Sequence, residues 1–156
     1  MRFPQVVTFA PDDWLARQIG DLVRRRRWLL REARQLAAAK RLLAPPRPTV
    51  LLAQLDPRRE EPDGLQFLAD VHVAWPDVVM LVVSDVKINQ DQERAMWTAT
   101  VLDLGARGVV YPPLTRPVLE EIVDRMMTAV IERTRPGWEP PDDAVIDLAE
   151  EMLETR

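Results

Sequence analysis

Short apolar runs alternate with amphipathic segments along most of the chain. The third and fourth runs are apolar throughout, as strands buried on both faces of a parallel sheet require. The second run is short and flanked by arginines, which is typical of an edge strand. The predicted strands cover residues 5–10, 28–31, 49–53, 78–83 and 108–111.

Between these runs, apolar residues recur at helical spacing. Pro11, Asp12 and Asp13 supply a turn and an N-cap for the first helix, and Gly105 closes the fourth. The predicted helices cover residues 14–26, 33–43, 63–74, 90–104 and a last segment from 115 or 117 to about 133. This alternation favours an α/β fold of parallel βαβ units over a helical bundle or a β-sandwich.

Composition limits the classes of site that the chain can hold. With 156 residues, 47% of them hydrophobic, it suits one compact domain at residues 1–134 and a short appendage at 135–156. The lack of cysteine excludes disulfides, thiolate metal sites and cysteine nucleophiles. A single histidine, His72, excludes a multi-histidine metal site and is expected to be an ordinary helix residue. Without a leading apolar segment, a bacterial-type cytoplasmic protein with no membrane association is expected.

The net charge of -4 conceals an asymmetry. Residues 1–60 carry 13 Lys and Arg against 6 Asp and Glu, whereas residues 61–156 carry 8 against 19. Such polarity suits a charged partner or self-pairing, or merely reflects solvated helices. The run Arg24, Arg25, Arg26 and Arg27 invites a nucleic-acid interpretation, but the chain is acidic overall and no helix-turn-helix follows. Nucleic-acid binding is therefore not favoured, and the run is expected to be a solvated helix end.

Two segments carry a family resemblance. The stretch TVLLAQLDPRREEPDGLQFLADVHVAWPDVVMLVVSD, residues 49–85, resembles the centre of bacterial response-regulator receiver domains, and LGARGVVYPPL, residues 104–114, resembles their last strand and its following cis-proline, here Pro113. The resemblance covers roughly residues 4–132. It implies a flavodoxin-like sheet of five parallel strands in the order 2-1-3-4-5, flanked by helices, with the site at the carboxyl ends of the strands.

The same resemblance implies a phosphorylation site whose chemical groups are missing. In the family, an acidic pair and an acceptor aspartate hold Mg²⁺, a lysine offsets the phosphate charge, and a Ser or Thr binds phosphoryl oxygens. Here the corresponding positions fall on Ala10, Pro11, Ala53, Pro112 and Ser84, of which only Ser84 matches. The chain is therefore interpreted as a pseudo-receiver without enzymatic activity or cofactor.

The lost carboxylates leave one rescue to consider. A rewired acidic site would use Asp12, Asp13 and Asp56, although the first two also suit a helix cap and the third a turn. Ser84 and Asp85 are common capping residues at a strand end, so no nucleophile is inferred from them. The chain has no Walker or dinucleotide loop.

The remaining function is expected on surfaces. Receivers mostly contact partners through their fourth helix, fifth strand and fifth helix, which here implies Trp97, Arg107 and Tyr111; Tyr111 aligns with the family's switch aromatic. After a connector at residues 135–141, an acidic amphipathic helix is predicted. Its apolar stripe includes Ile146, Ala149, Met152 and Leu153. This helix is expected to pack on its own domain, on a twin chain or on a different protein, and the sequence does not decide among the three.

Together these observations predict a phosphorylation-independent, receiver-like interaction module in bacterial signalling or cell organisation. Its expected partner is another signalling or scaffold protein, with a homodimer possible. The alternatives are a small-ligand sensor that uses the strand-end crevice, or a DNA-binding regulator acting through Arg24 to Arg27.

Overall fold

The computed structural model describes residues 2–56, 59 and 62–134. Five parallel strands form one sheet in the order β2-β1-β3-β4-β5. This is the flavodoxin-like order that the resemblance implied, and that prediction is confirmed. The strands are β1 (Gln5–Phe9), β2 (Leu29–Ala33), β3 (Thr49–Leu55), β4 (Val79–Ser84) and β5 (Gly108–Val110).

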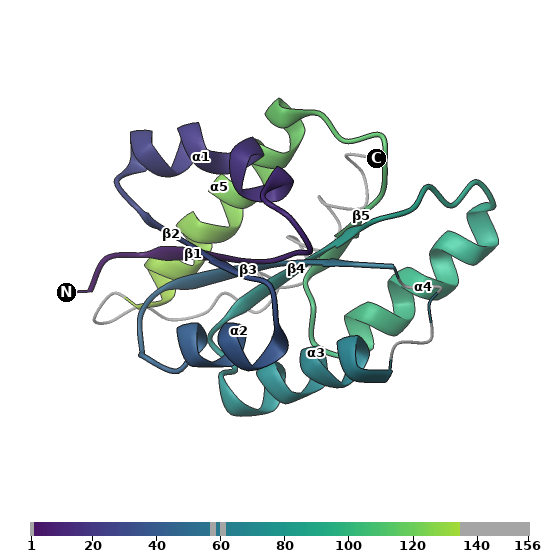
Figure 1. The fold of residues 1–156 in the computed structure, drawn as a ribbon, viewed down its shortest axis with the longest axis horizontal. Helices are drawn as coiled ribbons and strands as arrows, with labels where there is room; N and C mark the ends of the chain where they lie inside the picture. Colours follow the sequence, from purple (N-terminus) through teal and green to yellow (C-terminus); the bar gives the residue numbers. More distant parts are fainter. Residues whose placement is uncertain (1, 57–58, 60–61, 135–156) are drawn as a thin grey trace.

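The helices cover both faces of the sheet (Figure 1). On one face, α1 (Trp14–Arg26) and α5 (Arg116–Arg133) pack over a core that includes Val6, Leu52 and Leu81. On the other face, α2 (Leu36–Leu43), α3 (Pro62–Ala74) and α4 (Asp91–Asp103) lie over a second core that includes Leu51 and Phe67. Alternation along the strands explains the division, because successive side chains point to opposite faces.

Three predicted boundaries were wrong by two or three residues, and several others by one residue. β2 runs from 29 to 33 rather than from 28 to 31, since its whole length pairs with β1. For that reason α2 begins at Leu36 instead of residue 33. β3 continues two residues past Ala53, because Gln54 and Leu55 pair with Val83 and Ser84 of β4. This last correction decides which β3 side chain reaches the end of the sheet.

The arginine run at the end of α1 ties that helix to α5. Arg25 pairs with Glu120 at 2.9 Å and Arg26 pairs with Asp124 at 2.8 Å. Arg24 forms an ion pair with Asp21, one turn earlier in α1. Arg27 is the left-handed C-cap, with φ of 59°. Three of the four guanidinium groups thus already have carboxylate partners within the domain.

In the described part of the chain, no helix is both long and apolar enough to cross a membrane. The predicted connector and acidic helix, with the stripe residues Ile146, Ala149, Met152 and Leu153, lie outside the described residues.

Candidate functional site

A crevice opens where the parallel strands end at their carboxyl side. It has a volume of about 240 Å³, and we call it the strand-end crevice. Its lining consists of Trp14, Gln54, Val83, Ser84, Asp85, Pro112 and Leu114. Two positions expected to mark the site, Ser84 and Pro112, are therefore brought together here. The peptide bond between Pro112 and Pro113 is cis, as the resemblance implied.

Gln54 is the β3 residue that lines the crevice, and Ala53 is not. Ala53 is fully buried in the core beneath α2 and α3, together with Leu51 and Phe67. Because β3 continues through residue 54, the side chain of Gln54 points to the opposite face, toward Trp14 and Leu114. The expectation that Ala53 is the β3 residue at the site was wrong by one residue, because Gln54 takes that place.

The chemistry of position 54 still lacks a phosphoryl acceptor. The Gln54 amide Nε2 donates a hydrogen bond to Asp85 Oδ1. Its other polar atom, Oε1, is buried without a hydrogen-bond partner in the described structure. A neutral amide is a far weaker nucleophile and metal ligand than a carboxylate.

Ser84 has a structural use at the end of β4. Its side chain is buried, with 3% exposed, and its hydroxyl donates to the carbonyl of Val86 at 2.8 Å. The N–H of Val86 lies 3.3 Å from the same oxygen and donates back to it. This reciprocal pair closes the turn after the strand, which is the capping use that serine at a strand end commonly has.

The first-strand positions contribute no charge. Ala10 is buried in the core under α1, and its N–H donates to Ala33 O at 3.2 Å. Pro11 is exposed in the loop that follows β1. Asp12 Oδ1 accepts a hydrogen bond from the N–H of Trp14 at 3.0 Å, and Asp13 pairs with Arg17 at 3.4 Å. Both aspartates therefore interact at the start of α1, although Asp13, the N-cap residue, makes no side-chain capping hydrogen bond.

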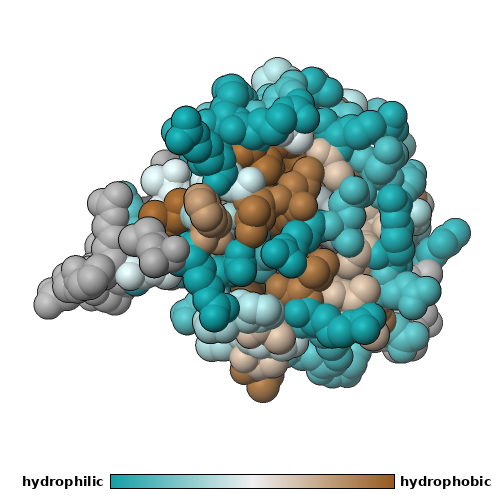
Figure 2. Space-filling view, turned by 60° about the vertical axis from the view of Figure 1, so that its left-hand side comes forward, coloured by the Kyte–Doolittle hydropathy of each residue, from teal (hydrophilic) through white to brown (hydrophobic). Residues whose placement is uncertain are grey.

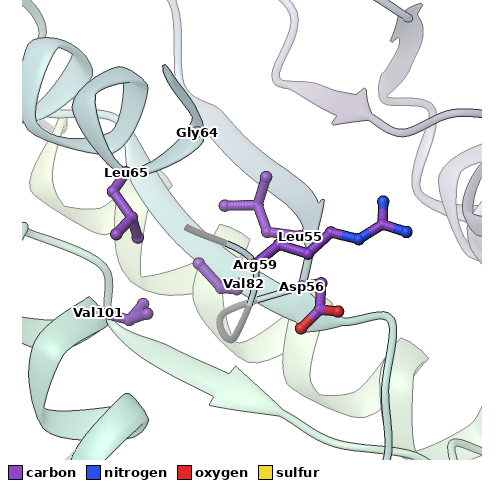
Figure 3. A pocket seen from close by; sticks show the side chains of 7 residues that line it. All are labelled: Leu55, Asp56, Arg59, Gly64, Leu65, Val82 and Val101. Atoms are coloured by element: carbon purple, nitrogen blue, oxygen red, sulfur yellow. The ribbon is translucent and has the colours of Figure 1, made fainter. Parts of the chain in front are cut away.

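Asp56 lies beside a different hollow, between β3, α3 and α4. Figure 3 shows Leu65 and Val101 directed toward Val82, while the charged ends of Asp56 and Arg59 lie away from them. The space enclosed is about 10 Å³, which is near the minimum for one water molecule. Among the described residues, no three His, Asp or Glu side chains group closely enough to hold a metal ion. A rewired site of Asp12, Asp13 and Asp56 is not assembled.

Tyr111 is buried, which contradicts its prediction as a partner contact. Only 6% of it is exposed, and its hydroxyl lies 3.1 Å from Thr98 Oγ1. The same hydroxyl donates to the carbonyl of Arg94 at 3.3 Å, and the Arg94 guanidinium lies 4.9 Å from the ring centre. The aromatic ring thus fastens α4 to the segment after β5. Sequence reasoning missed these contacts because nothing in the pattern signals a buried hydroxyl pair.

The two other predicted surface residues differ in position. Trp97 on α4 is half-buried, and its indole Nε1 is buried without a partner in the described structure. Arg107 precedes β5 at the opposite end of the sheet from the crevice, where its N–H donates to Met80 O at 2.8 Å.

Comparison with known proteins places the fold. The structure aligns with a response regulator from Thermotoga maritima at a TM-score of 0.65 and 14% identity, covering 81% of this chain and 99% of that one. It aligns with a CheY-like receiver domain protein from Methanospirillum hungatei JF-1 at a TM-score of 0.63 and 12% identity, covering 85% of this chain and 99% of that one. The fold is that of a receiver domain.

A third likeness is to the beryllofluoride-activated NtrC4 receiver domain dimer, with a TM-score of 0.62 and 12% identity, covering 81% of this chain and 98% of that one. No family model and no curated protein matches the sequence. At such low identity the receiver likeness establishes the architecture alone, so the chemistry must be argued from the crevice itself.

Proposed function

We propose that the protein is a receiver-like interaction module whose activity does not depend on phosphorylation, within cytoplasmic bacterial signalling or cell organisation. The observation that carries the proposal is the lining of the strand-end crevice. Its β3 position holds Gln54 instead of a carboxylate, and its position before the cis-proline holds Pro112 instead of a lysine.

The physical requirements of Mg²⁺-assisted phosphoryl transfer explain why this lining matters. Mg²⁺ exchanges part of its hydration shell only for hard anionic oxygens held in nearly octahedral geometry. Asp85 is the one carboxylate among the lining residues, and it accepts a hydrogen bond from the side-chain amide of Gln54. One exposed carboxylate, in a lining that includes no cation to offset phosphate charge, provides neither the metal site nor the acceptor.

The proposal predicts that acetyl phosphate does not modify the protein. The full chain is incubated with acetyl phosphate and Mg²⁺, and its intact mass is measured beside that of an ordinary receiver domain treated in the same tube. We expect the control to gain one phosphoryl group and this protein to gain none. A stoichiometric adduct on this protein would disprove phosphorylation independence.

The interaction half of the proposal requires a partner, which we infer to be a signalling or scaffold protein or a second copy of the chain. A receiver domain of the same fold, NtrC4, is described as a dimer. Partner capture from the native cell, performed with and without acetyl phosphate, is expected to recover the same protein in equal amounts. Recovery only with acetyl phosphate would contradict the proposal.

A second candidate function is small-ligand sensing in the same crevice. It is favoured by the open volume of about 240 Å³ and by the buried, unpartnered Oε1 of Gln54. That volume is just under the range of typical ligand pockets, which starts at about 300 Å³. A saturable thermal shift with nucleotides or small organic acids, lost in Gln54→Ala, would establish this function.

DNA binding is less favoured as a function because Arg24, Arg25 and Arg26 already pair with carboxylates.

A further inference from the structure

A large hollow lies at the other end of the sheet, where the strands begin. It has a volume of about 510 Å³, and we call it the amino-end groove. The half-buried Trp75 and Val78 supply apolar surface, the buried Leu43 and Val130 lie beneath it, and the segment 44–48 forms one wall. Figure 2, which brings this side forward, shows apolar surface framed by hydrophilic residues. A framed apolar hollow of this size is typical of a docking site.

The surroundings of the groove are cationic. Arg2 and Arg47 line it, and Asp77 is the one carboxylate in its lining. Arg133 adjoins Thr134, another lining residue, and lies close enough to Arg107 to act on it electrostatically. Burial, and after it the charge of Arg133, lower the pKa of Arg107. In the part of the chain that the structure describes, no carboxylate pairs with Arg107 or Arg133. The groove thus suits an occupant that is apolar on one side and acidic on the other.

The chain itself carries a segment of that chemistry, and the described structure ends at the groove. Thr134 is the last described residue, and it lines the groove. From residue 136 to the end there are seven acidic residues and one arginine. Within this stretch, Val145, Ile146, Ala149, Met152 and Leu153 recur at helical spacing. Seven residues, 135–141, precede residue 142, and such a length reaches about 23 Å when extended.

We propose that residues 142–154 dock as an acidic amphipathic helix in the amino-end groove of their own chain. The apolar stripe covers Trp75 and Val78, and the carboxylates face Arg47, Arg107 and Arg133. The short tether favours this occupant over a free partner, because it sets a local concentration of about millimolar. The proposal stands whether or not the strand-end crevice binds phosphate.

The test compares two full-length variants that add the same charge. Ile146→Asp places a carboxylate in the apolar stripe, whereas Ala144→Asp places it off the stripe. In the unaltered chain, we expect amide-exchange protection over residues 145–153 and a Trp75 indole signal that is independent of protein concentration. Ile146→Asp is expected to remove the protection and shift the Trp75 signal, and Ala144→Asp to leave both unchanged.

A second experiment reverses the charge of the groove instead of altering the segment. The double variant Arg47→Glu and Arg133→Glu is expected to lose the protection over 145–153 while its other amides stay protected. The proposal is overturned if the unaltered segment has no protection, or if both aspartate variants behave alike. It is also overturned if protection rises with protein concentration and sedimentation finds dimers, since the occupant would then be a second copy.

Discussion

Ala53→Asp is expected to destabilise the domain by about 3 to 5 kcal/mol, although by sequence alignment it restores the aspartate that receivers carry. Ala53 is fully buried among Leu51, Phe67 and other apolar side chains, and the described residues of this second core include no cation. An ionised carboxylate there loses its hydration without gaining a partner. Urea unfolding of the two proteins measures the difference.

Gln54→Asp is the matched control, one residue further along the same strand. Its side chain reaches the strand-end crevice, where water has access, and the change is expected to cost only about 1 kcal/mol. Part of that cost arises because the new carboxylate faces Asp85, the present partner of the Gln54 amide. If Ala53→Asp were as stable as Gln54→Asp, residue 53 would lie in the crevice and the register of β3 against β4 would be shifted by one residue.

Gly105→Ala is expected to cost at least about 2 kcal/mol. Gly105 has φ of +105°, a backbone conformation that residues with a side chain rarely adopt. An added Cβ would also lie 2.6 Å from Cβ of His72 on α3. Since that atom is fixed to the helix backbone, α3 or the turn after α4 must move. Thermal unfolding monitored by circular dichroism measures the loss.

Gly20→Ala is the contrasting variant. Gly20 lies inside α1, and an added Cβ would meet only the end of the Arg24 side chain at 4.0 Å. Alanine is favoured over glycine in a helix interior, so we expect a gain of about 0.5 to 1 kcal/mol. Equal effects at Gly20 and Gly105 would contradict the steric account of the α4–β5 turn.

The strands could be predicted because each apolar run is bounded by turn residues and separated from the next by a helical pattern, whereas their order was implied by the resemblance to receiver domains. The side of the sheet that each β3 residue faces could not be predicted from the sequence. Residues 49–53 are all buried, so no alternation reveals which side chains face α1 and which face α3. The first polar residue after the run, Gln54, was the available signal for the crevice position.

The missed contacts of Arg25, Arg26 and Tyr111 are long-range. From the sequence, Arg25 and Arg26 were expected to be solvated charges. Their partners Glu120 and Asp124 are distant along the chain and contact them only because α5 packs on α1. Tyr111 was predicted to be a surface aromatic residue because Thr98, the neighbour of its hydroxyl, lies on a different element of the fold. Sequence periodicity reports the exposure of a helix face, whereas these pairings depend on how the elements are packed together.

The most direct test of the central claim is a nuclear magnetic resonance titration of the isotope-labelled full chain with Mg²⁺ and beryllofluoride, which together mimic a bound phosphoryl group. The backbone N–H of Ser84 and the side-chain amide of Gln54 report on the crevice from β4 and β3. We predict that neither signal shifts in a saturable way at millimolar Mg²⁺. A saturable, Mg²⁺-dependent shift of both signals would contradict the claim that this receiver fold works without phosphorylation.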